Sequence, residues 1–253
     1  MRSPMEVYLL VILATPVFAQ PTQWLYAATG ETASAIQNEV NRFRSDLGDL
    51  NPNEPNSFPA GRREINWDGV GGTQGNDNLP QDFFHRTSPR GLILSTPGIR
   101  LKVSGDRDTP SFAMRDLTSS DWIDEVVAFS ADKFFAPIRS TITDVEFRVP
   151  GTQEIACVTA FGAVFMDVDR TGSLMEVTMA DGSTRTFAAP VQPGSRGFSF
   201  VGVRFAAGCI VNVRLVNGDT PVDSADRSHP NPDRVGIDDF IYAEPLSVTR
   251  GRY

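Results

Sequence analysis

The second half of the chain is a succession of short apolar segments separated by turn residues. From Leu92 onward, segments rich in Val, Ile, Phe and Thr recur at fairly regular intervals, and Asp181-Gly182 is typical of a tight hairpin turn. This spacing predicts a mainly all-β fold with two packed antiparallel sheets, a jelly-roll-like β-sandwich. The expected strands are 92–95, 99–103, 125–129, 143–149, 155–168, 174–179, 185–188, 198–205, 209–216 and 235–242.

One segment ahead of these strands has the periodicity of a helix. Within residues 32–47 the apolar positions fall at alternating steps of three and four, and Gly48 follows. The pattern predicts an amphipathic helix that packs on a sheet. Residues 51–81 are dense in Asn, Pro, Gly and Asp around Ile65 and Trp67, which indicates a long ordered loop. We therefore expect residues 20–90, the helix and the loop, to pack on the sandwich of residues 91–253 as one domain.

The first 19 residues have the order of a secretory signal peptide. Arg2 precedes an apolar run, and Val17-Phe18-Ala19 forms a small-residue end. This predicts cleavage before Gln20 and a secreted or periplasmic protein; an uncleaved N-terminal anchor is the alternative. The apolar run is shorter than the roughly 20 residues of a membrane-spanning helix, so the chain is not expected to span a membrane after cleavage.

The net charge limits the expected binding partners, and the cysteine content bears on a possible disulfide. The formal net charge of −8 argues against nucleic acid, whose phosphates are bound by Lys and Arg, and is compatible with divalent cations or neutral glycans. Cys157 and Cys209 both lie in strand-like runs. They either form a disulfide in an oxidising compartment or stay as two buried thiols.

Several sequence phrases resemble a family of uncharacterised secreted bacterial proteins. They are 61–69 (GRREINWDG), 88–91 (SPRG), 95–98 (STPG), 147–152 (FRVPGT), 161–169 (FGAVFMDVD) and 238–245 (DDFIYAEP). The last two are also similar to jelly-roll carbohydrate-binding modules. That second resemblance implies a glycan ligand and a structural calcium held by an aspartate of a late strand.

Two acidic pairs are candidate metal ligands. Asp167 and Asp169 stand at alternate positions before Gly172, like the first half of a calcium loop, although Thr178 occupies the place of the final glutamate. A plain hairpin with solvated aspartates is the alternative. Strand alternation turns Asp239, beside Asp238, to the same face as its apolar neighbours. An inward carboxylate needs calcium, backbone amides or an Arg from the long loop.

The most distinctive polar cluster is a candidate ligand-binding site in the long loop. Polar groups around an exposed aromatic often hold sugars, whereas a buried Trp would instead anchor the loop to the sandwich. Glu64 and Asp68 are also the residues available for a glycosidase pair, which needs two carboxylates flanking the scissile bond. The cluster consists of Arg62, Arg63, Glu64, Asn66, Trp67 and Asp68.

These observations lead to one functional hypothesis and two rivals. The first is a secreted, non-catalytic jelly-roll-like module that binds a glycan or a cell-surface or matrix component, with calcium as a structural ion. The second is a glycoside-active enzyme using Glu64 and Asp68. The third is a purely structural envelope protein without a small ligand.

Overall fold

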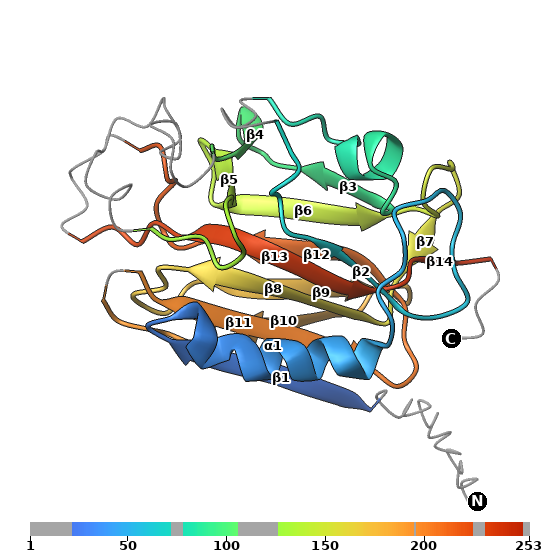
Figure 1. Ribbon diagram of the computed structural model, residues 1–253, viewed down its shortest axis with the longest axis horizontal. Coiled ribbons are helices and arrows are strands. Elements are labelled where there is room, and N and C mark those ends of the chain that lie inside the picture. The colour runs from blue at the N-terminus through green and yellow to red at the C-terminus, as the bar shows by residue number, and fades with distance from the viewer. Residues whose placement is uncertain (1–21, 72–77, 106–125, 195, 225–230, 250–253) are drawn as a thin grey trace, which may run out of the picture.

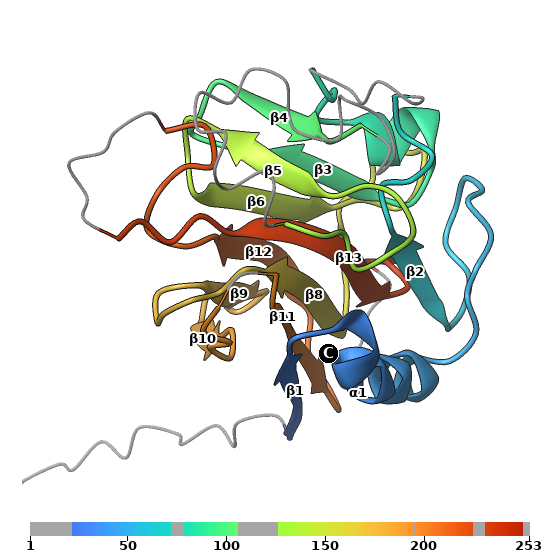
Figure 2. The same cartoon turned by 60° about the vertical axis from the view of Figure 1, so that its left-hand side comes forward.

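Two antiparallel sheets pack face to face in the computed structural model, as Figures 1 and 2 show. It describes residues 22–71, 78–105, 126–194, 196–224 and 231–249. The predicted signal peptide, residues 1–19, lies outside these ranges. The expected mainly β sandwich with a helix near its N-terminus is confirmed.

The larger sheet contains seven strands in the order β1-β11-β8-β13-β5-β4, with β2 paired to β13 as well. Both β5 and β2 lie along the edge of β13 that β8 leaves free, because β5 pairs with its start and β2 with its end. The strands are β1 (Gln23–Gly30), β2 (Arg62–Ile65), β4 (Arg100–Val103), β5 (Phe135–Ile138), β8 (Ala160–Met166), β11 (Phe198–Phe205) and β13 (Gly236–Ala243).

The second sheet has the order β10-β9-β12-β6-β3, and a two-stranded ribbon joins β14 to β7. The strands of the second sheet are β3 (Leu92–Ser95), β6 (Ile142–Phe147), β9 (Leu174–Met179), β10 (Thr184–Ala188) and β12 (Ile210–Val216). The ribbon consists of β7 (Ala156–Cys157) and β14 (Leu246–Ser247), and a π-helical turn, η2 (Phe83–Thr87), lies beside β3.

Helix α1 (Ala33–Leu47) covers the outer face of the larger sheet near β1 and β11 (Figure 1). Its Ile36, Val40 and Phe43 are buried, as the helical periodicity predicted. Phe43 fits where Gly162 of β8 faces Gly202 of β11, and a Cβ atom at Gly162 would lie 2.9 Å from the ring. Two glycines therefore let the helix approach the sheet closely.

Several elements differ from the sequence predictions. The N-terminal part is more than a helix and a loop, because β1 and β2 are strands of the larger sheet. β1 is an edge strand with an exposed Trp24 and Leu25, so its alternation of burial is weak. The stretch 155–168 is interrupted between β7 and β8. The described part of 125–129 forms no strand, because its end binds a side chain instead of a neighbouring strand.

The two ends of the sandwich differ in their connections. Three links pass between the sheets at one end: 167–173 (β8 to β9), 189–197 (β10 to β11) and 217–235 (β12 to β13). We call this the crossover end. At the opposite, disulfide end, Cys157 and Cys209 form a disulfide with Cα atoms 5.2 Å apart. Across the described ranges, no helix is long and apolar enough to cross a membrane.

Candidate functional site

The candidate site begins at an irregularity in β13. The pairing of β13 with β8 shifts register between Ile237 and Phe240. An irregularity of this kind disrupts strict alternation, so neighbouring side chains can both turn inward. Asp238 and Asp239 are accordingly both buried, whereas alternation predicted only Asp239. They lie where the edge of β13 passes from β5 to β2.

Asp238 is bound by the segment that follows Ala128. Its Oδ2 accepts hydrogen bonds from the backbone N–H groups of Phe129 at 2.6 Å and Ser130 at 3.1 Å, and its Oδ1 accepts one from the Ser130 hydroxyl at 3.0 Å. Burial and the adjacent Asp239 raise the pKa of Asp238 well above its usual value. Asp238 therefore secures the 126–130 segment to the sheet.

Asp239 has one occupied and one unoccupied oxygen. Its Oδ2 accepts a hydrogen bond from Nη2 of Arg44 at 2.8 Å, whereas the buried Oδ1 has no hydrogen-bond partner. Burial raises the pKa of Asp239 to about 6, against the opposing effect of Arg44. An arginine of the long loop was one of the three alternatives for Asp239, beside calcium and backbone amides, and the arginine that contacts it comes from α1.

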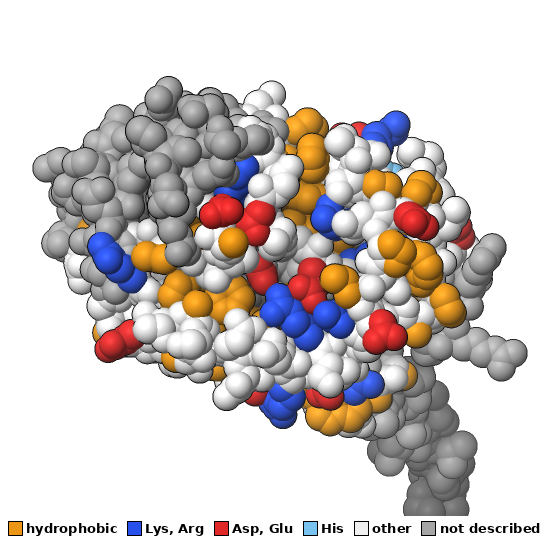
Figure 3. Space-filling view, viewed as in Figure 1, with side chains coloured by type: hydrophobic (Ala, Val, Ile, Leu, Met, Phe, Trp, Pro, Cys, Tyr) orange, Lys and Arg blue, Asp and Glu red, His pale blue; other side chains and the backbone are white. Residues whose placement is uncertain are grey.

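A polar pocket of about 380 Å³ opens beside Asp239. Figure 3 shows acidic and basic side chains gathered on this face between α1 and the strands β2 and β13. Glu64 lies within it and is held by Arg44, at 2.9 Å, and by Arg62, at 2.6 Å. The lining is formed by Gln37, Arg44, Leu50, Asn51, Asn53, Glu64, Asn66, Arg90, Phe129, Ser130 and Asp239.

The sequence cluster at 62–68 is divided by the alternation of β2. Glu64 and Asn66 line the pocket, and Arg62 shares their side of the strand. Arg63 points inward, where its guanidinium contacts both oxygens of Glu244 at 2.7 and 2.8 Å. The predicted ligand set is therefore not a single surface.

Trp67 and Asp68 hold the loop in place. Trp67 is only 1% exposed and stacks on Phe135 with ring centroids 4.4 Å apart, so its ring anchors the loop in the core. Asp68 accepts backbone hydrogen bonds from Asp132 and Lys133 through Oδ1, and a side-chain hydrogen bond from Asn66 through Oδ2. Both oxygens of Asp68 are therefore occupied by structural contacts.

Arg44 was not among the residues expected to form a site. Its sequence position did carry a signal, because it continues the i, i+4 stripe of Ile36 and Val40 at the border of the buried face. A long side chain there can keep its stem on the sheet and bring its charge to the pocket. Gln37, Arg90 and Ser130 carried no comparable pattern.

The second predicted acidic pair lies at the crossover end. Asp167 accepts a hydrogen bond from the N–H of Arg196 at 3.3 Å, and Asp169 accepts one from the N–H of Gly194 at 2.9 Å. Asp219 and Asp233, which the sequence did not single out, lie against this loop. In the described ranges, no three acidic, histidine or cysteine side chains are already arranged around one metal position.

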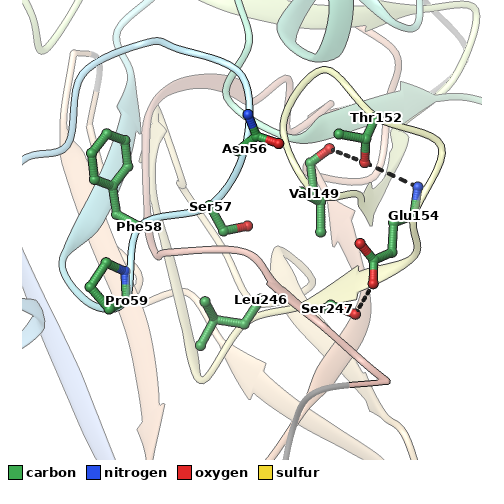
Figure 4. A pocket seen from close by; sticks show the side chains of 9 residues that line it. All are labelled: Asn56, Ser57, Phe58, Pro59, Val149, Thr152, Glu154, Leu246 and Ser247. Carbon is green, nitrogen blue, oxygen red and sulfur yellow. Dashed lines mark hydrogen bonds between the residues drawn. The ribbon is translucent and has the colours of Figure 1, made fainter.

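A second pocket, also about 380 Å³, lies at the disulfide end (Figure 4). Its polar groups mostly bind one another: the Thr152 hydroxyl donates to the carbonyl of Val149, the Glu154 N–H donates to Thr152, and the Ser247 hydroxyl donates to Glu154. The pocket beside Asp239 retains an unpartnered buried oxygen and is therefore the stronger candidate binding site.

Comparison of the chain with protein-family models, curated proteins and solved structures gives no match, so the candidate site is defined by its own geometry.

Proposed function

We propose that this protein is a secreted or periplasmic, non-catalytic β-sandwich module that binds a glycan in the pocket beside Asp239. The observation that carries the proposal is the unpartnered Oδ1 of Asp239 in a pocket lined largely by amide, carboxylate and guanidinium groups. A buried acceptor without a donor is costly, and a ligand hydroxyl would supply that donor.

The lining suits a polyhydroxylated ligand. Asn53 and Asn66 are exposed and carry both donors and acceptors, which match the hydroxyls of a sugar. Leu50, 56% exposed, and the half-buried Phe129 offer apolar surface for the carbon face of a ring. Because Trp67 is buried, recognition would rest on hydrogen bonds more than on aromatic stacking.

The contacts of Glu64 and Asp68 favour binding over hydrolysis by these two residues. Glu64 accepts hydrogen bonds from two arginines, and Asp68 is committed to its own loop. A glycosidase pair needs one carboxyl to donate a proton and the other to attack or to activate water. Neither group is arranged for those roles in the described structure.

A glycan array probed with the full mature chain tests the proposal. We expect a restricted set of bound glycans, and we expect Asn53→Ala and Gln37→Ala to weaken their binding roughly tenfold each, about 1.4 kcal/mol. Asn38→Ala is the matched control, since Asn38 is exposed on α1 but lies outside the pocket lining.

Two results would contradict the proposal. One is an array without any bound glycan, or binding that Asn53→Ala and Asn38→Ala affect equally. The other is release of new reducing ends from a bound glycan, which would show that the module is catalytic.

A further inference from the structure

Three aspartates from two connections meet at the crossover end. Asp169 lies between β8 and β9, Asp219 follows β12, and Asp233 precedes β13. The backbone N–H of Asp169 donates to Oδ1 of Asp233 at 3.1 Å, and the N–H of Asp233 donates to Oδ1 of Asp219 at 2.9 Å. Two links between the sheets therefore converge on Asp233.

Asp233 differs from the buried carboxylates of Glu244 and Asp238. It is 1% exposed, and its Oδ2 has no hydrogen-bond partner. Glu244, by contrast, contacts Arg63, and Asp238 accepts three hydrogen bonds. An ionised carboxylate that is buried without such partners is strongly unfavourable.

Like charges add to this cost. Backbone hydrogen bonds join Asp233 to Asp169 and to Asp219, so the carboxylates of these two residues place further negative charge near it. The guanidinium of Arg170 lies 3.7 Å from Oδ2 of Asp219 and donates no hydrogen bond to Oδ2 of Asp233. The buried Oδ2 of Asp233 therefore has two further carboxylates nearby and accepts no hydrogen bond within the described ranges.

We propose that Asp169, Asp219 and Asp233 bind a calcium ion that ties the connections of the two sheets together. Calcium takes oxygen ligands in flexible geometry, and sites in extracellular modules bind with Kd values of about 10⁻⁴ to 10⁻³ M. The partly exposed side chains of Asp169 and Asp219 would turn toward Oδ2 of Asp233, with backbone carbonyls and water completing the shell. This site is separate from the proposed glycan pocket.

Thermal unfolding of the full mature chain in EDTA and in about 10 mM CaCl₂ tests the site. For Kd values in this range, mass action predicts a rise in Tm of about 3 to 10 °C. Asp233→Asn should abolish the rise. Asp132→Asn, which removes the same charge from an exposed position, should keep it. Calorimetric titration of the wild-type chain with CaCl₂ should give about one site per chain.

The proposal is overturned if the wild-type Tm is the same in CaCl₂ and EDTA, or if titration shows no binding. It is also overturned if Asp233→Asn retains the full rise, or if Asp239→Asn alone abolishes it, which would place the ion in the pocket. Should Asp233→Asn not fold, Asp169→Asn decides the same question, because its side chain is only partly buried. Glycan binding is measured separately, so failure of one proposal leaves the other standing.

Discussion

The two ends of the sandwich differ in how their buried charges are paired. At the disulfide end, Cys157 and Cys209 are covalently joined, and the buried Glu244 accepts hydrogen bonds from Nε and Nη2 of Arg63. At the crossover end, Asp233 is equally buried but shares its surroundings with two further carboxylates. The buried charge at the disulfide end is thus paired within the protein, whereas at the crossover end the proposed calcium ion would supply the pairing.

This difference has consequences for stability. A buried ion pair such as Arg63–Glu244 contributes little compared with a well-packed apolar pair, but removal of one partner leaves an uncompensated charge. The crossover end already contains such an uncompensated charge at Asp233. A substitution that removes this charge should therefore raise the free energy of unfolding. Mutations at the two ends therefore test the cost of a buried uncompensated charge: one creates such a charge, and the other removes it.

The largest expected effect is at the disulfide end. Glu244→Ala leaves Arg63 buried without its carboxylate and also removes the acceptor for Asn51 and for the N–H of Phe58. We expect a loss of about 3 to 5 kcal/mol in the free energy of unfolding, measured by urea denaturation. A loss below about 1 kcal/mol would show that water or another group stabilises the buried guanidinium of Arg63 in the variant.

The disulfide should contribute somewhat less. Cys157 and Cys209 are 52 residues apart, and the paired variant Cys157→Ala, Cys209→Ala should lose about 2 to 4 kcal/mol. The loss should be the same in EDTA and in CaCl₂, because the two ends are far apart and independent. A loss that depends on calcium would show that the two ends unfold as one cooperative unit, and it would contradict their independence.

Asp233→Asn should act in the stabilising direction when calcium is absent. Because the pKa of Asp233 is about 6 in the folded protein and about 3.9 in an unfolded chain, its protonation favours folding. That contribution is present below pH 4 and is lost as the pH rises through 6. In EDTA the variant should therefore exceed the wild type by about 1 to 3 kcal/mol at pH 7 and match it near pH 4.

Urea denaturation of both proteins across this pH range measures the difference. A variant that is less stable than the wild type at pH 7 in EDTA would mean that the carboxylate of Asp233 is already neutralised.

The smallest effect should come from the rim of the proposed glycan pocket. Asn53 is exposed, so Asn53→Ala should change the free energy of unfolding by no more than about 0.5 kcal/mol. Thermal melting checks this, and it also shows whether weakened glycan binding reflects the pocket or the fold. A loss above about 1 kcal/mol would make Asn53 a structural residue.

The sandwich and the helix could be predicted because their signals are local. The stripe of Ile36, Val40 and Phe43 and the apolar runs of β8 and β11 follow directly from their periodicity. β2 could not be predicted in this way, because its four residues include Arg62, Arg63 and Glu64, and its strand partner, β13, is distant in the sequence. Alternation along those residues then decided which charges reach the pocket.

The candidate sites were predicted only in part for a similar reason. Asp239 was expected to turn inward, but the register shift in β13 buries Asp238 as well. Asp169 was identified by its calcium-loop spacing, whereas Asp219 and Asp233 come from another connection, β12 to β13, that only the fold brings beside it. A buried cluster assembled from separate loops leaves no spacing pattern in one sequence.

A crystal structure of the protein grown with CaCl₂, with anomalous scattering recorded for calcium, tests the contrast between the ends most directly. We predict an anomalous peak at the crossover end, with oxygens of Asp169, Asp219 and Asp233 at about 2.3 to 2.6 Å from it. A crossover end without a peak, with Oδ2 of Asp233 hydrogen-bonded to a protein donor, would contradict it.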